Sequence, residues 1–211
     1  MGAEQGLMTA ATLRTRTQFC GGYTVDRITV RADYMQRVTH IYTSQVSLIP
    51  ALQFSIDVKA SGFGGLSYPI EDGVALDTDS KYCSLIRPEP DWTHWDLEAE
   101  KVHRIARDIL EAYGKPLQEV AAHMNELFEG KTLYTDGWVV DKPWLTTLFH
   151  KANMHMRFQV SPLEMILSES QMERWHETKD LIIGEMTARR HRASYDAWII
   201  QETYKRTLEA G

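Results

Sequence analysis

The sequence predicts an α/β fold in which a mixed β-sheet is flanked by helices. Two observations support this fold class. Short segments with alternating apolar and polar residues come first, and segments of strand and helix character then alternate along the chain. A length of 211 residues, with 43% hydrophobic and 25% charged residues, suits one globular domain with an appendage.

Three short strands are predicted between residues 52 and 86. Residues 52–58 alternate apolar and polar side chains, and the glycine-rich run 61–65 then breaks the pattern. Residues 70–76 and 81–86 have the character of two further strands, and the polar run 77–80 predicts a turn between them. The three strands together predict a meander.

The second half of the chain is richer in helix signals. Pro116 suits a first helical position, and the apolar residues after it recur at helical spacing as far as Phe128. Ser161, Pro162 and Glu164 form the pattern of a helix start. The remaining predictions are strands over 132–135 and 157–160, and helices over 142–151 and 192–208.

The first 48 residues differ from the rest. Residues 1–50 contain five arginines, no lysine and three acids, with little periodicity, whereas the whole chain has a net charge of −6. We expect residues 1–48 to be a poorly ordered or peripheral extension of a domain over 49–211. Extra strands on the domain and a targeting peptide are the alternatives, and the second lacks an apolar core segment.

Composition restricts the cellular setting and the partners. No run of apolar residues is long enough to span a membrane. Cys20 and Cys83 form no metal-type pair, which favours reduced cysteines and a cytoplasmic location. An acidic total argues against a protein that coats long nucleic acid, but it is compatible with an enzyme that uses bound metal ions.

Three segments carry candidate chemistry. Asp57 lies at the end of the first predicted strand, Asp141 precedes an apolar helix, and His191 is followed five residues later by Asp196. In this order and spacing, these residues resemble the DEDD-type (DEDDh) 3′–5′ exonucleases, the superfamily of polymerase proofreading subunits, RNase T and oligoribonuclease. Two flanking segments also match: 69–75 is similar to the family's second strand, and 102–105 resembles its His-Gly-Ile segment.

The resemblance implies a ribonuclease H-like, mixed five-stranded sheet and a two-metal mechanism. Asp57, Asp141 and Asp196 would bind Mg²⁺ or Mn²⁺, because hard divalent ions prefer oxygen ligands. His191 would act as the general base that takes a proton from a metal-bound water. The family also implies single-stranded or short 3′ ends as substrates, and a homodimer.

Lys59 departs from the family pattern. The first motif should be Asp-x-Glu, but Lys59 occupies the position of the glutamate. A charged ammonium offers no lone pair to a metal ion and repels one. Either the activity is weakened or lost, or a nearby acid such as Glu71 or Asp136 replaces the missing ligand.

Four further residues are candidate contacts for nucleic acid. Trp92 can stack on a base or anchor a loop, and Arg189 and Arg190 can touch phosphate or remain solvated. Ser61 follows the first motif and is the fourth candidate.

Two classes of function therefore compete. The first is a metal-dependent 3′–5′ exonuclease, a phosphodiester hydrolase, impaired by Lys59. The second is an inactive pseudo-exonuclease that serves as a nucleic-acid-binding or interaction module.

Overall fold

The computed structural model describes residues 52, 54–76, 80–186 and 191–209, and the backbone of 19–20 and 23–24. The chain divides into two units, Met1–Gln45 and Val46–Gly211. In the first unit, β1 (Phe19–Cys20) pairs antiparallel with β2 (Tyr23–Thr24). The extension predicted over 1–48 and the turn at 77–79 lie largely outside the described residues.

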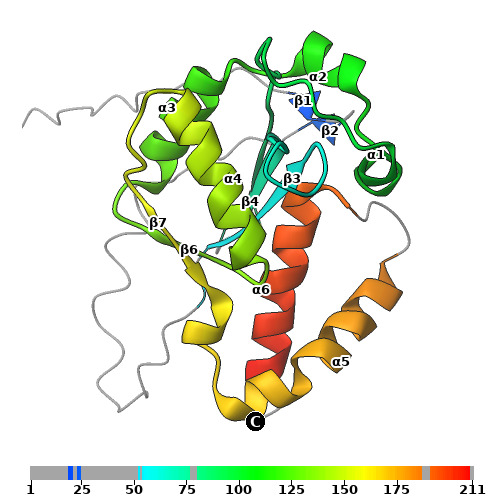
Figure 1. Cartoon of the computed structure of the whole chain (residues 1–211). Helices are drawn as coiled ribbons and strands as arrows, with labels where there is room; N and C mark the ends of the chain where they lie inside the picture. The colour runs from blue at the N-terminus through cyan, green and yellow to red at the C-terminus, as the bar shows by residue number, and fades with distance from the viewer. Residues whose placement is uncertain are drawn as a thin grey trace, which may run out of the picture. The chain divides into compact units, whose positions relative to one another are not determined.

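The second unit contains the predicted five-stranded mixed sheet, in the order β5-β4-β3-β6-β7 (Figure 1). The strands β3 (Ser55–Ala60), β4 (Pro69–Ala75) and β5 (Lys81–Leu85) form the antiparallel meander. The strands β6 (Thr132–Thr135) and β7 (Gln159–Pro162) add to it in parallel. Both the fold class and the meander are confirmed.

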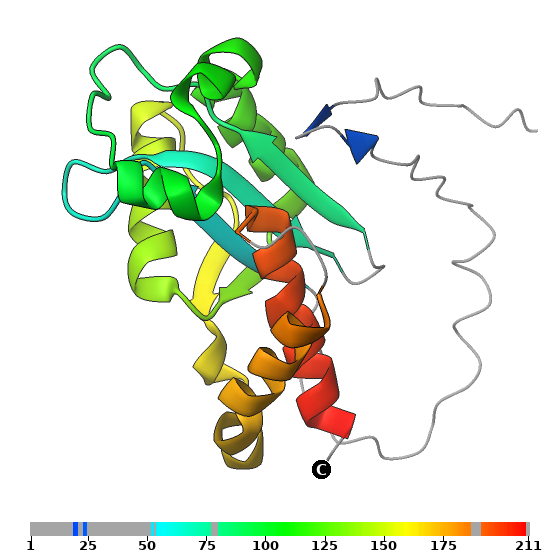
Figure 2. The ribbon, with the colours of Figure 1, turned by 90° about the vertical axis from the view of Figure 1, so that its right-hand side faces the viewer.

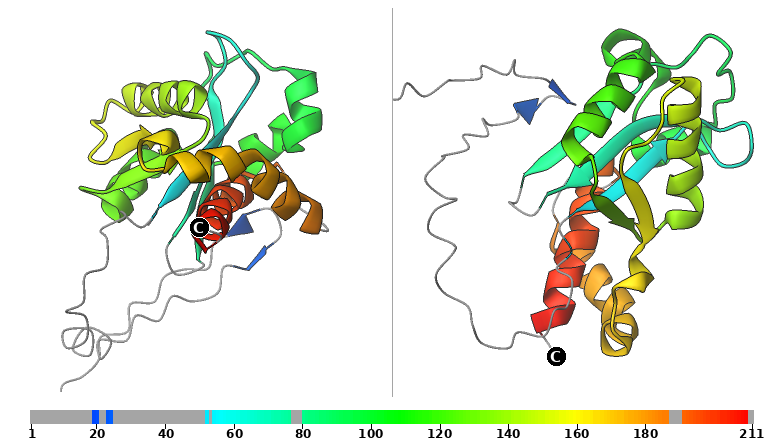
Figure 3. Two further views of the ribbon diagram at one scale, coloured as in Figure 1. Left: turned by 90° about the horizontal axis from the view of Figure 1, so that it is seen from below. Right: turned by 90° about the vertical axis from the view of Figure 1, so that its left-hand side faces the viewer.

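Helices cover both faces of this sheet (Figures 2 and 3). On one face lie α3 (Leu117–Phe128) and α4 (Trp138–Lys151), and on the other lies α6 (Ala193–Glu209) with α5 (Glu169–Glu185) packed on it. The short helices α1 (Leu97–His103) and α2 (Arg107–Tyr113) follow β5.

Successive side chains of β3 point to opposite faces of the sheet. Ile56 and Val58 join the main core, where they pack with buried residues of α3 and α4 such as Met124 and Leu148. The next residues along the strand, Asp57 and Lys59, therefore face α6. The polar face of β3 and the first turn of α6 thus meet at one place.

One predicted helix is wrong. Ser161 and Pro162 end β7, where they pair with β6, and only the single 3₁₀ turn η2 (Leu163–Met165) follows. The long helix α5 begins later, where Ser168 and Gln171 exchange the two hydrogen bonds of a capping box. The Ser-Pro-x-Glu pattern predicts a helix start, but here Ser161 and Pro162 pair with β6 as part of a strand.

The expectation of reduced cysteines is also wrong, because Cys83 is disulfide-bonded. None of the helices in the described residues is both long and apolar enough for a membrane span.

Candidate active site

The site begins with two side chains of β3 that point toward α6. The side chains of Asp57 and Lys59 are only 18% and 17% exposed. They are two residues apart on one strand, so they lie on the same face of the sheet. Ser55, on the same face, donates a hydrogen bond of 2.7 Å from its hydroxyl to the carbonyl of Ala197 in α6.

Gly73 lets α6 approach the sheet closely. Gly73 lies on β4 and pairs with Asp57 of the neighbouring strand β3. A Cβ atom at Gly73 would lie 2.1 Å from the backbone nitrogen of Ser194, at the start of α6. Any side chain here would push the helix away, so the glycine brings the first turn of α6, with Asp196, over Asp57 and Lys59.

Lys59 bridges the two carboxylates. Its ammonium lies 2.5 Å from Asp196 Oδ2, to which it donates a hydrogen bond, and 2.9 Å from Asp57 Oδ2, in an ion pair without hydrogen-bond geometry. Burial alone would lower the pKa of Lys59, but Asp57 and Asp196 raise it above its usual value. Lys59 therefore stays charged between two acids that would be metal ligands.

Asp57 responds to the same surroundings. Burial raises its pKa to about 6, and the nearby charge of Asp196 raises it too, whereas Lys59 lowers it. Lys59 thus offsets part of the cost of keeping two carboxylates close together.

Asp141 reaches the site from the opposite layer. It lies in the first turn of α4 and is 3% exposed. One oxygen accepts a 3.2 Å hydrogen bond from the Val58 backbone N–H, and the other accepts one from the Thr135 hydroxyl. Burial, together with the charge of Asp57, raises the pKa of Asp141 to about 8. Asp141 is close to Asp57, but both its oxygens are occupied by protein donors.

His191 lies two residues before the start of α6. Its backbone adopts a positive φ of 71°, and its N–H donates a 3.4 Å hydrogen bond to Asp196 Oδ1. This hydrogen bond joins the backbone of His191 to Asp196, the other residue of the same sequence motif. Its part as a general base remains a prediction.

Neither acid suggested as a replacement ligand is free for that role. Glu71 is fully buried, and Arg192 binds it through Nε at 2.9 and 3.1 Å and through Nη2. Glu71 also accepts a 2.8 Å hydrogen bond from the Ala193 N–H, which fixes the start of α6 on β4. Asp136 forms an ion pair with Lys179 of α5. Within the described part of the chain, no three acidic, histidine or cysteine side chains are arranged to hold a metal ion.

Arg192, Lys179 and Thr135 were not predicted from the sequence. Each acts through a partner far away in the chain; Arg192 and Glu71, for example, are 121 residues apart. No spacing signal links such residues. Only the adjacency of Arg192 to His191 could have drawn attention to it.

Of the four candidate nucleic-acid contacts, two have structural partners. The Ser61 hydroxyl is buried and accepts a 3.2 Å hydrogen bond from the Tyr68 N–H. The rings of Trp92 and Tyr68 stack with a centroid distance of 4.9 Å. The backbone carbonyl of Trp92 accepts a hydrogen bond from Arg107. These contacts support the loop-anchor interpretation of Trp92. Arg189 and Arg190 lie outside the described residues.

Searches for similar sequences gave no match, either among protein-family models or among curated proteins. Solved structures do match. A complex of E. coli exonuclease I with single-stranded DNA has a TM-score of 0.58 and 13% identity, with 74% of this chain and 42% of that chain covered.

Two other structures give similar values. Exonuclease I of Methylocaldum szegediense has a TM-score of 0.56 and 12% identity, over 75% of this chain and 40% of that one. A 3′-exonuclease that recognises the 3′ end of a histone mRNA stem-loop has a TM-score of 0.55 and 16% identity, over 75% and 63%. This chain thus spans less than half of either exonuclease I. The likeness establishes that the second unit has the fold of the exonucleases, with a mixed five-stranded sheet flanked by helices.

Proposed function

We propose that this chain is a nucleic-acid-binding domain with an exonuclease fold, which takes single-stranded or short 3′ ends and hydrolyses phosphodiesters slowly or not at all. The observation that carries the proposal is the Lys59 ammonium between Asp57 and Asp196. The exonuclease fold and the oligonucleotides bound in the similar E. coli structures support nucleic acid as the ligand.

The residues present do not fit a pair of Mg²⁺ or Mn²⁺ ions. One carboxylate of the family pattern is absent, and a cation lies within 2.9 Å of two of the three that remain. At ~4 Å and an effective dielectric of ~20, two unit charges interact by about 4 kcal/mol, and a divalent ion roughly doubles this repulsion. The ammonium therefore replaces a metal ion as the neutralising charge.

An exonuclease that is merely weakened is the second candidate. The presence of Asp57, Asp141 and Asp196 in one place favours it, since these are the three carboxylates that the family pattern uses for metal binding. A cytoplasmic location and a homodimer are further proposals that follow from the family resemblance alone.

The test replaces Lys59 with glutamate. Lys59→Glu should create or strongly raise Mg²⁺-dependent 3′–5′ degradation of a labelled single strand, because it removes the repelling charge and supplies the missing ligand. Asp196→Ala in the same background should abolish the gain. Lys59→Met, which removes the charge without adding a ligand, should fall between native protein and Lys59→Glu.

Each outcome has a definite meaning. Native cleavage equal to that of Lys59→Glu would contradict the proposal and favour the second candidate. If neither protein cleaves the strand, the result favours a nucleic-acid-binding module without nuclease activity. Binding of the same oligonucleotide to native protein, measured by fluorescence anisotropy in EDTA, is required in every case, and its absence would overturn the nucleic-acid assignment.

A further inference from the structure

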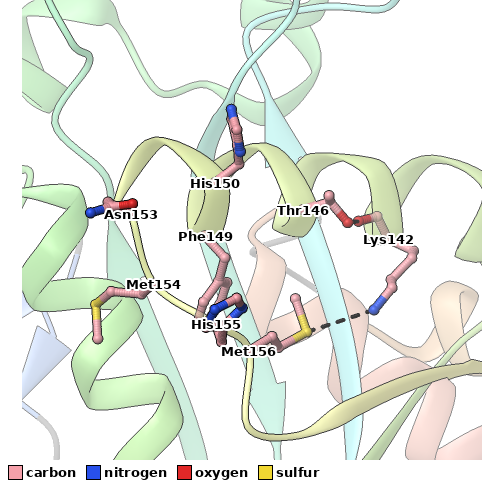
Figure 4. A pocket seen from close by; sticks show the side chains of 8 residues that line it. All are labelled: Lys142, Thr146, Phe149, His150, Asn153, Met154, His155 and Met156. Atoms are coloured by element: carbon pink, nitrogen blue, oxygen red, sulfur yellow. Dashed lines mark hydrogen bonds between the residues drawn. The ribbon is translucent and has the colours of Figure 1, made fainter.

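A pocket lies beside α4. It has a volume of about 320 Å³, and none of the site residues predicted from the sequence lines it (Figure 4). Its lining comes from α4 and the segment that follows: Lys142, Thr146, Phe149, His150, Asn153, Met154, His155 and Met156.

The polar groups of this pocket are suited to an anion. None of the eight lining residues is acidic, although the chain as a whole has a net charge of −6. Lys142 contacts Met156 Sδ at 3.7 Å, and no carboxylate of the described residues pairs with it. Asn153 and His155 add exposed side chains that can donate hydrogen bonds. In Figure 4, Lys142 reaches toward Met156, and His155 lies beside Met156.

A second lysine of the same helix makes the contrast clear. Lys151 binds both carboxylate oxygens of Asp91, at 2.7 and 2.9 Å, and does not line the pocket. Its charge is already neutralised within the protein. Lys142 has no such partner in the described chain, so its charge remains available to a ligand.

The apolar part of the pocket is suited to a flat group. Phe149 is buried, and Met154 and Met156 are half-buried. Methionine side chains adapt to aromatic surfaces. A volume of about 320 Å³ is at the lower end of the range for small-molecule sites. A ligand that joins an anionic group to a planar ring matches both parts of the lining.

We propose that this pocket binds a nucleotide, with the phosphate at Lys142 and the base against Phe149, Met154 and Met156. Lys142 follows Asp141 directly, and the pocket extends from there along α4 for about 12 Å as far as His150. The nucleotide is either free or part of a strand whose end lies near Asp57. The choice of a nucleotide rests on the proposed function, whereas anion binding does not.

The experiment uses the full chain labelled with ¹³C at its methionine methyl groups. AMP and, separately, inorganic phosphate are titrated in, and the methyl signals of Met154 and Met156 report on the pocket. AMP should shift both signals. Lys142→Gln should weaken AMP binding about tenfold, as expected for a lost hydrogen bond between charged groups. Lys151→Gln removes the same charge from the same helix outside the pocket and should leave the affinity unchanged.

A labelled single strand of DNA distinguishes the two sources. If Lys142→Gln weakens both strand and AMP binding while Lys151→Gln weakens neither, the pocket holds a nucleotide of the strand. If only AMP binding weakens, the ligand is a free nucleotide. The proposal that the pocket binds a nucleotide would be wrong if AMP shifted neither methyl signal. It would also be wrong if Lys142→Gln and Lys151→Gln weakened AMP binding equally. If native protein binds AMP but not the strand, the nucleotide pocket is supported and the proposed function is wrong.

Discussion

Asp72 is a buried acid whose protonation is controlled by the fold. It lies on β4 between Glu71 and Gly73, and its side chain is fully buried. The buried Tyr82 hydroxyl is a polar neighbour of this carboxyl group, but no residue described forms a hydrogen bond of good geometry with either oxygen. Burial raises the pKa of Asp72 to about 8. The folded protein therefore holds this carboxyl group in its protonated form at neutral pH.

This predicts a pH dependence of stability. The unfolded chain loses the proton near pH 3.8, whereas the folded chain keeps it up to about pH 8. Because the folded state binds more protons in this window, the contribution of Asp72 to the free energy of unfolding falls as pH rises from 4 to 8. Asp72→Asn cannot ionise, so its free energy of unfolding relative to native protein should rise steadily from pH 4 to pH 8, by roughly 2–5 kcal/mol.

Urea unfolding at pH 5, 6, 7 and 8 measures this difference. The exposed Asp180→Asn, on α5, is the control and should leave the profile unchanged. A constant difference between Asp72→Asn and native protein across the range would show that Asp72 does not keep its proton in the fold.

At the scale of an element, the end of α1 carries strain. Arg104 caps this helix with φ 57° and ψ 32°, and its N–H bonds the carbonyl of Glu100. This left-handed conformation is unfavourable for residues with a Cβ atom. The segment resembles the family's His-Gly-Ile motif, in which glycine takes the position of Arg104. Arg104 thus adopts a backbone conformation that suits glycine.

Arg104→Gly should therefore raise the free energy of unfolding by about 0.5–1 kcal/mol, since glycine adopts this conformation without steric cost. Arg104→Ala removes the same side chain but keeps the Cβ atom, so it should bring no comparable gain. Thermal unfolding of the three proteins at one pH provides the comparison. Equal gains from both variants would mean that the arginine side chain, rather than its backbone conformation, is unfavourable.

At the scale of the whole molecule, the five-stranded sheet and its helices form a unit with a core of its own. All the strands that carry Asp57 and its neighbours, and all the covering helices, belong to Val46–Gly211. We predict that a chain lacking residues 2–45 still unfolds cooperatively, with little loss of stability. Both proteins are compared in reducing buffer, so that the state of Cys83 is the same in each. A loss of several kcal/mol would show that the first unit is part of the domain's structure.

Much of the fold could be predicted because it depends on local patterns. Alternation predicted β3, helical spacing predicted α3, and β6 was predicted with its observed bounds. The family resemblance predicted that Asp57, Asp141 and Asp196 form one site, and in the structure Asp57 and Asp196 share a contact with Lys59. Prediction failed at Ser161, where a local helix signal competed with a strand partner.

The sequence by itself determined that a lysine lies two residues after Asp57, where the pattern that it resembles has a carboxylate. Only the tertiary structure decided what that lysine does. Lys59 binds Asp196, 137 residues away, because Gly73 lets α6 lie on the sheet, and Glu71 is bound by Arg192 instead of remaining free. A buried charge is stabilised by whichever opposite charge the packing brings within reach, and packing is a property of the assembled layers that no local segment encodes.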